Sequence, residues 1–350
     1  MQRSTTSRPI ARTRSAVLSL TAVSALAALT ACGSAAGDDT ADAGGETNQT
    51  ITVYTSEPQA KIDEIVSAFE EQHDGANVEV FRAATGELKA RLATEQESGG
   101  IQADVLLAAD VPTFEAYAAE GALAELDIDN AGDLEDNLVD KEGFWVGTRI
   151  IPTVIAYNTE VISDAPTSWA ELTNAEYSGQ IAMPNPDVSG AAAFNTAVWL
   201  AEDDLGETWL EDLVANDPTV LESNGPVGQA VAGGTNGIGI VVDYVIRELA
   251  EQGSPVDLEY PTDGVPYVSQ PAGVFADSEN QETANAFVDF LISEQGQQLA
   301  VEQSYLPVRG DVGVPEGAPE LAELNLLDPD LNEIAATQND AVDLFNSMVR

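Results

Sequence analysis

Apolar and polar residues are arranged in blocks along residues 51–107, and these blocks predict alternating strands and helices. Three short apolar runs predict strands, at 51–55, 78–81 and 105–107. The segment between the first two runs has apolar residues at the i, i+3, i+4, i+7 spacing of one buried helix face, namely Ile62, Ile65, Val66 and Phe69. Alternating strands and helices predict an α/β fold with a parallel sheet.

In a parallel sheet of this kind, ligands are bound by the loops at the carboxyl ends of the strands. The three predicted strands end in polar or small residues: Thr55, Ser56, Glu57, Thr85, Gly86, Ala109 and Asp110. None of these side chains is a strong nucleophile or base. The pattern therefore indicates a binding edge, with Ser56, Glu57, Thr85 and Asp110 as the candidate ligand-binding residues.

Two long extended stretches with an internal proline interrupt the pattern, at 150–157 and 265–275. Proline lacks the N–H that a central strand needs, so the first stretch is not expected to be a plain central strand. We interpret both stretches as crossovers between two α/β lobes. The first lobe is predicted to comprise 51–150 plus 270–303, and the second lobe 151–269 plus 304–350, with a ligand cleft between them.

The second lobe contains a candidate anion site. Ser189, Gly190 and Ala191 begin a predicted helix, where backbone N–H groups suit a bound anion. The same serine could instead be a plain N-cap, and the local sequence leaves both interpretations open. Asp243 and Tyr244 follow the buried strand 237–242, although the first could simply cap a helix and the second could pack in the core.

The N-terminal residues predict an export signal. Residues 1–31 combine a positively charged start with an apolar stretch too short to form a stable membrane span. They end in Leu29-Thr30-Ala31-Cys32-Gly33, which resembles the lipobox of bacterial lipoproteins. This resemblance implies that Cys32, the only cysteine, is lipidated and anchors the chain to a membrane. Residues 32–50 then form the lipidated end and a flexible tether.

The charge of the chain excludes some partners. The sequence has 13 basic and 60 acidic residues, and removing 1–31 leaves 9 basic residues and a formal charge of −51. Binding to nucleic acid or to an anionic membrane requires basic patches, so neither is expected. The acids are scattered along the chain, which favours a solvated acidic coat over a dedicated cation-binding surface.

Catalytic motifs are missing from the sequence. There is no G-x-S-x-G elbow, no P-loop and no spacing typical of a zinc site, and His73 is the only histidine. Most general-base and zinc mechanisms need more than this. We therefore predict that the chain is not an enzyme, with a secreted hydrolase as the alternative and turnover of a generic phosphate ester as the test.

The chain resembles a known family, the extracellular solute-binding proteins of bacterial ABC importers. It is most similar to the branch with ferric-iron-binding and phosphonate-binding members. The segments that carry the resemblance are TVYTS at 52–56, AFEE at 68–71, QADVLLAAD at 102–110, GTRIIPTVIAYNT at 147–159, SGAAAF at 189–194, SNGPVGQAV at 223–231, GIVVDY at 239–244, AFVDFLISEQGQ at 286–297 and YLPVR at 305–309. The resemblance implies a two-lobed periplasmic-binding-protein-like fold with two crossover strands.

The resemblance also implies site residues. The elements that hold a synergistic anion in ferric-binding members match at Ser189, Gly190, Ala191 and Asn224. The metal elements match poorly, because the family's tyrosine pair is Tyr244-Val245 here. The first loop, 56–60, has no histidine, and the acidic position after the third strand is Ala109, beside Asp110. No metal site is therefore assigned, with Tyr244 as the candidate if the ligand is ferric iron.

These observations favour a small anionic solute, such as a phosphonate or a phosphorylated organic compound. Ser189, Asn224 and Arg149 would hold its anionic end, and Glu57, Asp110 or Asp243 an amine at the other end. We expect a monomer without a cofactor, lipid-anchored at the extracellular face of the cell membrane. Its expected partners are the permease and ATPase subunits of the importer. A ferric-iron-binding protein with a synergistic anion is the alternative.

Overall fold

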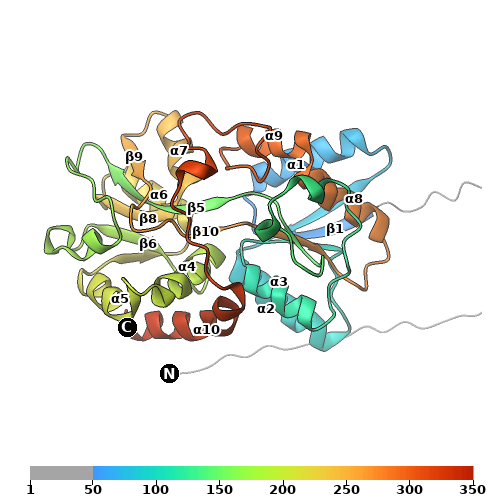
Figure 1. Cartoon of the computed structure of the whole chain (residues 1–350), viewed down its shortest axis with the longest axis horizontal. Helices are drawn as coiled ribbons and strands as arrows, with labels where there is room; N and C mark the ends of the chain where they lie inside the picture. Colours follow the sequence, from blue (N-terminus) through green and yellow to red (C-terminus); the bar gives the residue numbers. More distant parts are fainter. Residues whose placement is uncertain (1–49, 350) are drawn as a thin grey trace, which may run out of the picture. The chain divides into compact units, whose positions relative to one another are not determined.

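The computed structural model describes residues 50–349. The predicted signal peptide, Cys32 and nearly all of the tether lie outside the described residues. Within residues 50–349, the chain forms two β-sheets covered by helices (Figure 1). The expected α/β fold is confirmed.

The first sheet has five strands in the order β2-β1-β3-β11-β4. Its strands are β1 (Thr50–Thr55), β2 (Asn77–Arg82), β3 (Val105–Leu107), β4 (Val146–Gly147) and β11 (Pro271–Val274). The strands β1, β2 and β3 pair in parallel, as predicted, whereas β11 runs antiparallel to both β3 and β4. The helices of this part of the chain are α1 (Gln59–Gln72), α2 (Thr85–Ser98), α3 (Val111–Ala119), α8 (Gln281–Ile292) and α9 (Glu294–Glu302).

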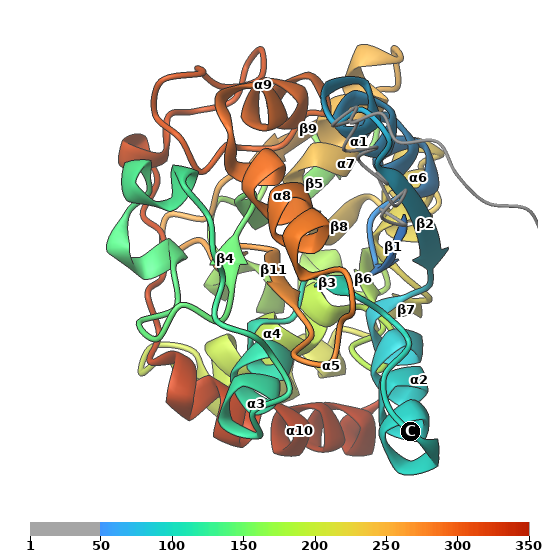
Figure 2. The same cartoon turned by 90° about the vertical axis from the view of Figure 1, so that its right-hand side faces the viewer.

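Alternation of apolar residues along the strands places helices on both faces of the first sheet (Figure 2). Val53, Val105 and Leu107 pack in one buried cluster with side chains of α1 and α8. Tyr54 and Leu106 face the other way and join α2 and α3. A strand buried on both faces must be apolar throughout, which explains the run 105–107.

The second sheet has six strands, with β10-β5-β8-β6-β7 in order and β9 also paired to β5. Its strands are β5 (Ile151–Asn158), β6 (Ile181–Pro184), β7 (Thr219–Leu221), β8 (Ile238–Val242), β9 (Val256–Glu259) and β10 (Tyr267–Val268). The helices of this part are α4 (Gly190–Ala201), α5 (Gly206–Ala215), α6 (Asn224–Ala232), α7 (Asp243–Glu251) and α10 (Leu331–Met348). Short 3₁₀ helices, η1 to η5, lie at Asn130–Asp133, Asp136–Leu138, Ala170–Thr173, Ala175–Tyr177 and Leu321–Glu323.

The chain passes from the first sheet to the second between β4 and β5, and returns between β10 and β11. Both predicted crossovers are therefore present. The prediction that Pro152 would keep its strand out of the centre is wrong, because β5 pairs with β8 on one side and with β9 and β10 on the other. The proline is tolerated because it lies at the second residue of β5, opposite the two-residue strand β10.

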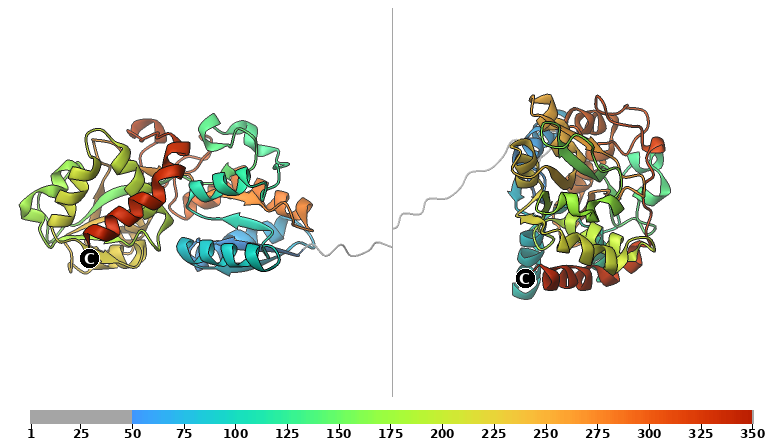
Figure 3. Two further views of the ribbon diagram at one scale, coloured as in Figure 1. Left: turned by 90° about the horizontal axis from the view of Figure 1, so that it is seen from below. Right: turned by 90° about the vertical axis from the view of Figure 1, so that its left-hand side faces the viewer.

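The helix α10 lies across the ends of both parts. It packs against α3, which covers the first sheet, and against α4, which covers the second (Figure 3). Gln338 donates a hydrogen bond from Nε2 to Asp110 Oδ1 (2.9 Å), and Asn346 donates from Nδ2 to Asp187 Oδ1 (3.0 Å). Asp330 caps the start of this helix, where its side chain accepts hydrogen bonds from the backbone N–H groups of Asn332 and Glu333.

No helix within residues 50–349 has the length and apolar character needed to cross a membrane.

Candidate functional site

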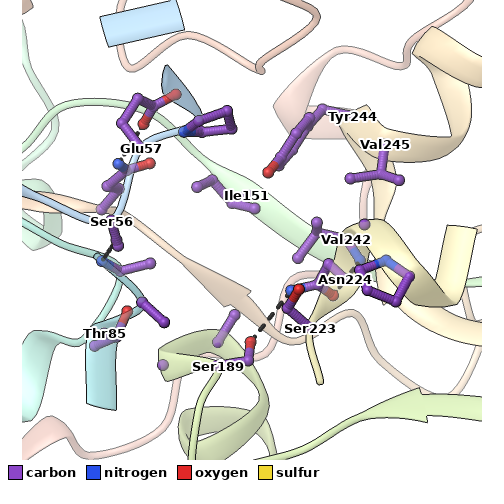
Figure 4. Close-up of a pocket in the computed structure, with 18 of the residues that line it drawn as sticks. Ser56, Glu57, Thr85, Ile151, Ser189, Ser223, Asn224, Val242, Tyr244 and Val245 are labelled. Atoms are coloured by element: carbon purple, nitrogen blue, oxygen red, sulfur yellow. Dashed lines mark hydrogen bonds between the residues drawn. The ribbon is translucent and has the colours of Figure 1, made fainter. Parts of the chain in front are cut away.

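A pocket of about 580 Å³ lies where loops and helix starts from both sheets meet (Figure 4). Its lining includes the first residues of α2, α4 and α6 and the second residue of α7. The first amides of a helix have no acceptor within the helix and carry the positive end of its dipole. The pocket therefore offers several N–H groups to an anion. Its volume is in the range of small-molecule sites.

Ser189 and Asn224 form the polar wall on the side of the second sheet, the second-sheet wall. Ser189 caps α4 and accepts a hydrogen bond at Oγ from Ala192 N (3.3 Å). Asn224 Nδ2 donates to the same Oγ (3.2 Å), and Asn224 Oδ1 accepts from Val242 N (3.2 Å). With Oγ accepting twice, the serine O–H is left to donate, and Asn224 keeps a second N–H. Both groups line the pocket, as predicted, beside Gly190 and Ala191.

The start of α4 lies directly against the first-sheet part of the chain. Gly86 N, in α2, donates to Val188 O (3.3 Å). A Cβ on Gly190 would lie 2.4 Å from Ala109 O and 2.8 Å from Thr85 Cγ2. Only glycine fits at this close approach. Thr85 and Ser56 line the pocket here, and Ser56 Oγ accepts from Ala109 N (3.3 Å).

Glu57 is the centre of the opposite wall, the first-sheet wall. The side chain is buried, and its two oxygens accept from Tyr305 Oη (2.6 Å) and Gln270 Nε2 (2.5 Å). Arg149 Nη1 lies 3.2 Å from Glu57 Oε1 and forms an ion pair with it. The guanidinium also lies over the Tyr305 ring, 4.9 Å from its centroid. This carboxylate is therefore already paired within the protein.

Tyr244 reaches the pocket from the first turn of α7, with its hydroxyl directed toward the cavity (Figure 4). Its ring packs against Tyr305, with the centroids 4.5 Å apart. Burial raises the pKa of both phenols, and the nearby Glu57 carboxylate acts in the same direction. Both hydroxyls are therefore protonated donors at neutral pH.

Three predicted site residues do not line this pocket. Asp110 turns away toward α10 and pairs with Lys89 Nζ (3.0 Å). Asp243 is buried at the base of α7, where it pairs with Arg247 (2.7 Å). Burial raises the pKa of Asp243, although Arg247 opposes this. Arg149 is paired with Glu57, has 2% of its side chain exposed and does not line the pocket.

Gln270, Tyr305 and Lys61 were not predicted as site residues. Lys61 Nζ lies 2.5 Å from Glu248 Oε1 and over the rings of Tyr244 and Tyr305. Burial lowers its pKa, against the opposing effect of Glu248. Gln270 lies in the return crossover, and Tyr305 lies after α9 in the segment 305–309; the proline and aromatic content of both segments was visible in the sequence. The position of Lys61 on a polar helix face gave no such signal.

The donor set offers limited support for a metal ion. Within residues 50–349, no group of three or more His, Cys, Asp and Glu side chains is arranged to hold one. His73, at the end of α1, stacks on Phe69 and does not line the pocket. Oxygen donors at the pocket would have to come from Tyr244, Tyr305 and carboxylates that are already paired.

The chain belongs to the family of bacterial extracellular solute-binding proteins, whose sequence model matches residues 101–333. Among curated relatives, it is 26% identical to the Fe(3+)-binding periplasmic protein of Serratia marcescens over 290 residues, 80% of this chain and 84% of that protein. The resemblance to solute-binding proteins of the ferric and phosphonate branch is therefore confirmed. The class of protein is an extracellular solute-binding protein, and one relative, 26% identical over 264 residues, is a probable ABC transporter periplasmic-binding protein of Sinorhizobium fredii.

Solved structures agree on the fold. Iron-bound HitA from Pseudomonas aeruginosa aligns with a TM-score of 0.75 and 25% identity, covering 85% of this chain and 99% of that one. The periplasmic binding protein AfuA from Actinobacillus pleuropneumoniae, with fructose-6-phosphate bound, aligns with a TM-score of 0.77 and 22% identity, covering 86% and 97%. The two-lobed fold is thus shared by proteins whose ligands differ.

Proposed function

We propose that this protein captures a small organic anion, a phosphonate or a phosphorylated compound, in the pocket and delivers it to the permease of an ABC importer. The observation that carries the proposal is the second-sheet wall. There Ser189 and Asn224 hold each other in place at the starts of α4 and α6, each with a donor to spare. Helix starts with fixed donors are suited to phosphate and phosphonate oxygens.

The rest of the pocket suits an organic body attached to that anionic group. Its lining includes apolar side chains, among them Ile151, Val245 and Leu249, together with the Tyr244 ring. A cavity of about 580 Å³ also exceeds what a bare phosphate would fill. The sugar phosphate bound to AfuA is a ligand of this kind on the same fold.

Ferric iron is the second candidate. It is favoured by the iron-binding relatives and by the two tyrosine side chains, Tyr244 and Tyr305, that line the pocket together. In that case the second-sheet wall would hold the synergistic anion. Native mass spectrometry of the mature domain without its lipidated cysteine, Gly33 to Arg350, separates the two candidates, because a retained metal ion and a retained organic phosphate differ in mass.

A double substitution, Ser189→Ala with Asn224→Ala, tests the anion site. We expect it to weaken binding of the ligand found by native mass spectrometry more than about tenfold in calorimetry, because buried anionic oxygens lose their donors. Ser293→Ala is the control: Ser293 caps α9 in the same manner, accepting from Gly296 N (3.1 Å), and does not line the pocket. Unchanged affinity in the double variant would contradict the anion site.

We also propose that lipid attached at Cys32 holds the protein at the outer face of the cell membrane, as a monomer. The support is the sequence 29–33 and the extracellular family. The intact mass of protein extracted from membranes tests it, since an unmodified chain that starts elsewhere would rule out the anchor.

A further inference from the structure

The carboxylates that line the pocket already have cations of their own. Among the described lining residues, the acids are Glu57 and Glu248. Glu57 forms an ion pair with Arg149 (3.2 Å), and Glu248 forms one with Lys61 (2.5 Å). Arg82 also lines the pocket. The pocket and its immediate surroundings thus hold three cationic side chains, Lys61, Arg82 and Arg149, and two carboxylates. This local excess of positive charge contrasts with the formal charge of −47 of the whole chain.

Among these cations, Lys61 contacts one lining carboxylate and both lining tyrosines. It projects from α1 with 10% of its side chain exposed, and its partner Glu248 is on α7. Nζ lies 4.3 Å from the ring centroid of Tyr244 and 4.1 Å from that of Tyr305. It also donates to the carbonyl of Gln303. A single ammonium group therefore contacts both tyrosines and the second carboxylate at once.

These contacts have consequences for the charge that the pocket accepts. A metal cation at the tyrosine hydroxyls would gain little from Glu57 and Glu248, because each carboxylate is already paired with a cation of the protein. It would also lie close to Lys61 and Arg149, and the repulsion between like charges is strong where water is largely excluded. The same two cations lower the energy of an anion in the pocket.

We infer that Lys61 is a specificity-determining residue, which makes this pocket accept an organic anion and reject a metal cation. The inference rests on the proposed function, and it adds the residue that decides between the two candidate ligands. Lys61 does not itself line the pocket. It acts on the pocket in two ways. Its ammonium group neutralises the Glu248 carboxylate, and it places a positive charge over the rings of Tyr244 and Tyr305.

The test compares Lys61→Met with the wild-type chain. The probes are inorganic phosphate, followed by calorimetry, and ferric nitrilotriacetate, followed by the visible absorption band of iron-bound tyrosinate. We expect the wild type to bind phosphate without forming the band. We expect Lys61→Met to bind phosphate about tenfold or more weakly, with a smaller dependence on salt, and to form the band with iron.

Two further variants separate charge from structure. Lys61→Arg keeps the charge and should restore both wild-type properties. Lys89→Met removes another ion-paired lysine, which contacts Asp110 outside the pocket, and should behave as the wild type. If Lys61→Met does not fold, Glu248→Gln still distinguishes an effect of charge on phosphate binding from a purely structural role. Removing this carboxylate should strengthen phosphate binding, whereas loss of a purely structural clamp would weaken it.

An iron–tyrosinate band in the wild type would overturn the inference, and so would a Lys61→Met variant with unchanged phosphate and iron binding. Weaker phosphate binding by Glu248→Gln would do the same. Failure of the proposed function looks different: the wild type would then bind neither phosphate nor any phosphonate or phosphate ester, while Lys61→Met still acquired iron.

Discussion

The two walls of the pocket differ in how their polar groups are used. On the second-sheet wall, Ser189 and Asn224 bond to each other and to backbone amides, and each retains a donor. On the first-sheet wall, Glu57 accepts from Tyr305 and Gln270 and pairs with Arg149. The second-sheet wall therefore has donors available for a ligand, whereas the polar groups of the first-sheet wall are paired with one another. A polar residue at a strand end is therefore a ligand residue only if its neighbours leave it unpaired.

The largest expected effect is a loss of stability when the paired groups of the first-sheet wall are disrupted. Glu57→Ala would leave the buried Arg149 guanidinium without its counter-ion, and Tyr305 and Gln270 without their acceptor. Removing one partner of a buried ion pair costs about 3–5 kcal/mol, so we expect a loss of that size in the free energy of unfolding, measured in urea. Glu97→Ala, at an exposed position of α2, is the control and should change it by less than about 0.5 kcal/mol. Equal stability of the two variants would mean that Glu57 is not a structural group.

A smaller effect is expected where the two walls meet. Gly190→Ala would place a methyl group 2.4 Å from Ala109 O, and the resulting separation of α4 from the first-sheet part costs about 1–3 kcal/mol. We expect weaker binding of the native ligand, by about fivefold to a hundredfold in calorimetry. Gly225→Ala is the matched control, since Gly225 also lines the pocket at a helix start and a Cβ there would meet nothing within 4 Å. Equal affinity of the two alanine variants for the ligand would mean that the close approach at Gly190 is not needed for binding.

The smallest effect separates the two candidate ligands. Tyr305→Phe removes the 2.6 Å hydrogen bond to Glu57, which keeps Gln270 and Arg149 as partners. We expect a loss of about 1 kcal/mol in the free energy of unfolding, and affinity for an organic anion within about twofold of the wild type. If Tyr305 were an iron ligand instead, the variant would lose iron binding altogether. Parallel unfolding and binding measurements on this variant give the answer.

Much of the fold could be predicted from the sequence because its signals are local. Apolar runs and the stripe on α1 identified β1, α1, β2 and β3, and the proline-containing stretches identified the crossovers. Alternation alone could not place β11 between β3 and β4, because these pairings join residues more than 120 positions apart. The central position of β5 was missed for the same reason. The predicted boundaries of the two lobes remain a prediction.

The site was predictable in part. Ser189, Gly190 and Asn224 belong to helix starts, and a helix start shows in a few adjacent residues. Asp110 and Asp243 were misplaced because their partners, Gln338 and Tyr260, are set by tertiary packing. Lys61 was missed because nothing in its helix tells that Tyr244, Tyr305 and Glu248 would surround it. The sequence shows which groups are polar, but the partners of each group depend on distant parts of the chain.

The order of the strands has a consequence for how this chain folds. Because β11 lies between β3 and β4, the first sheet cannot be completed until residue 274 has been synthesised, although four of its five strands end by residue 147. Pairings this distant make folding slow, since a long loop must close before the contact is gained. We expect a nascent chain to stay open for most of its synthesis. For a protein with the export signal predicted at residues 1–31, such a delay favours crossing the membrane before the fold is complete.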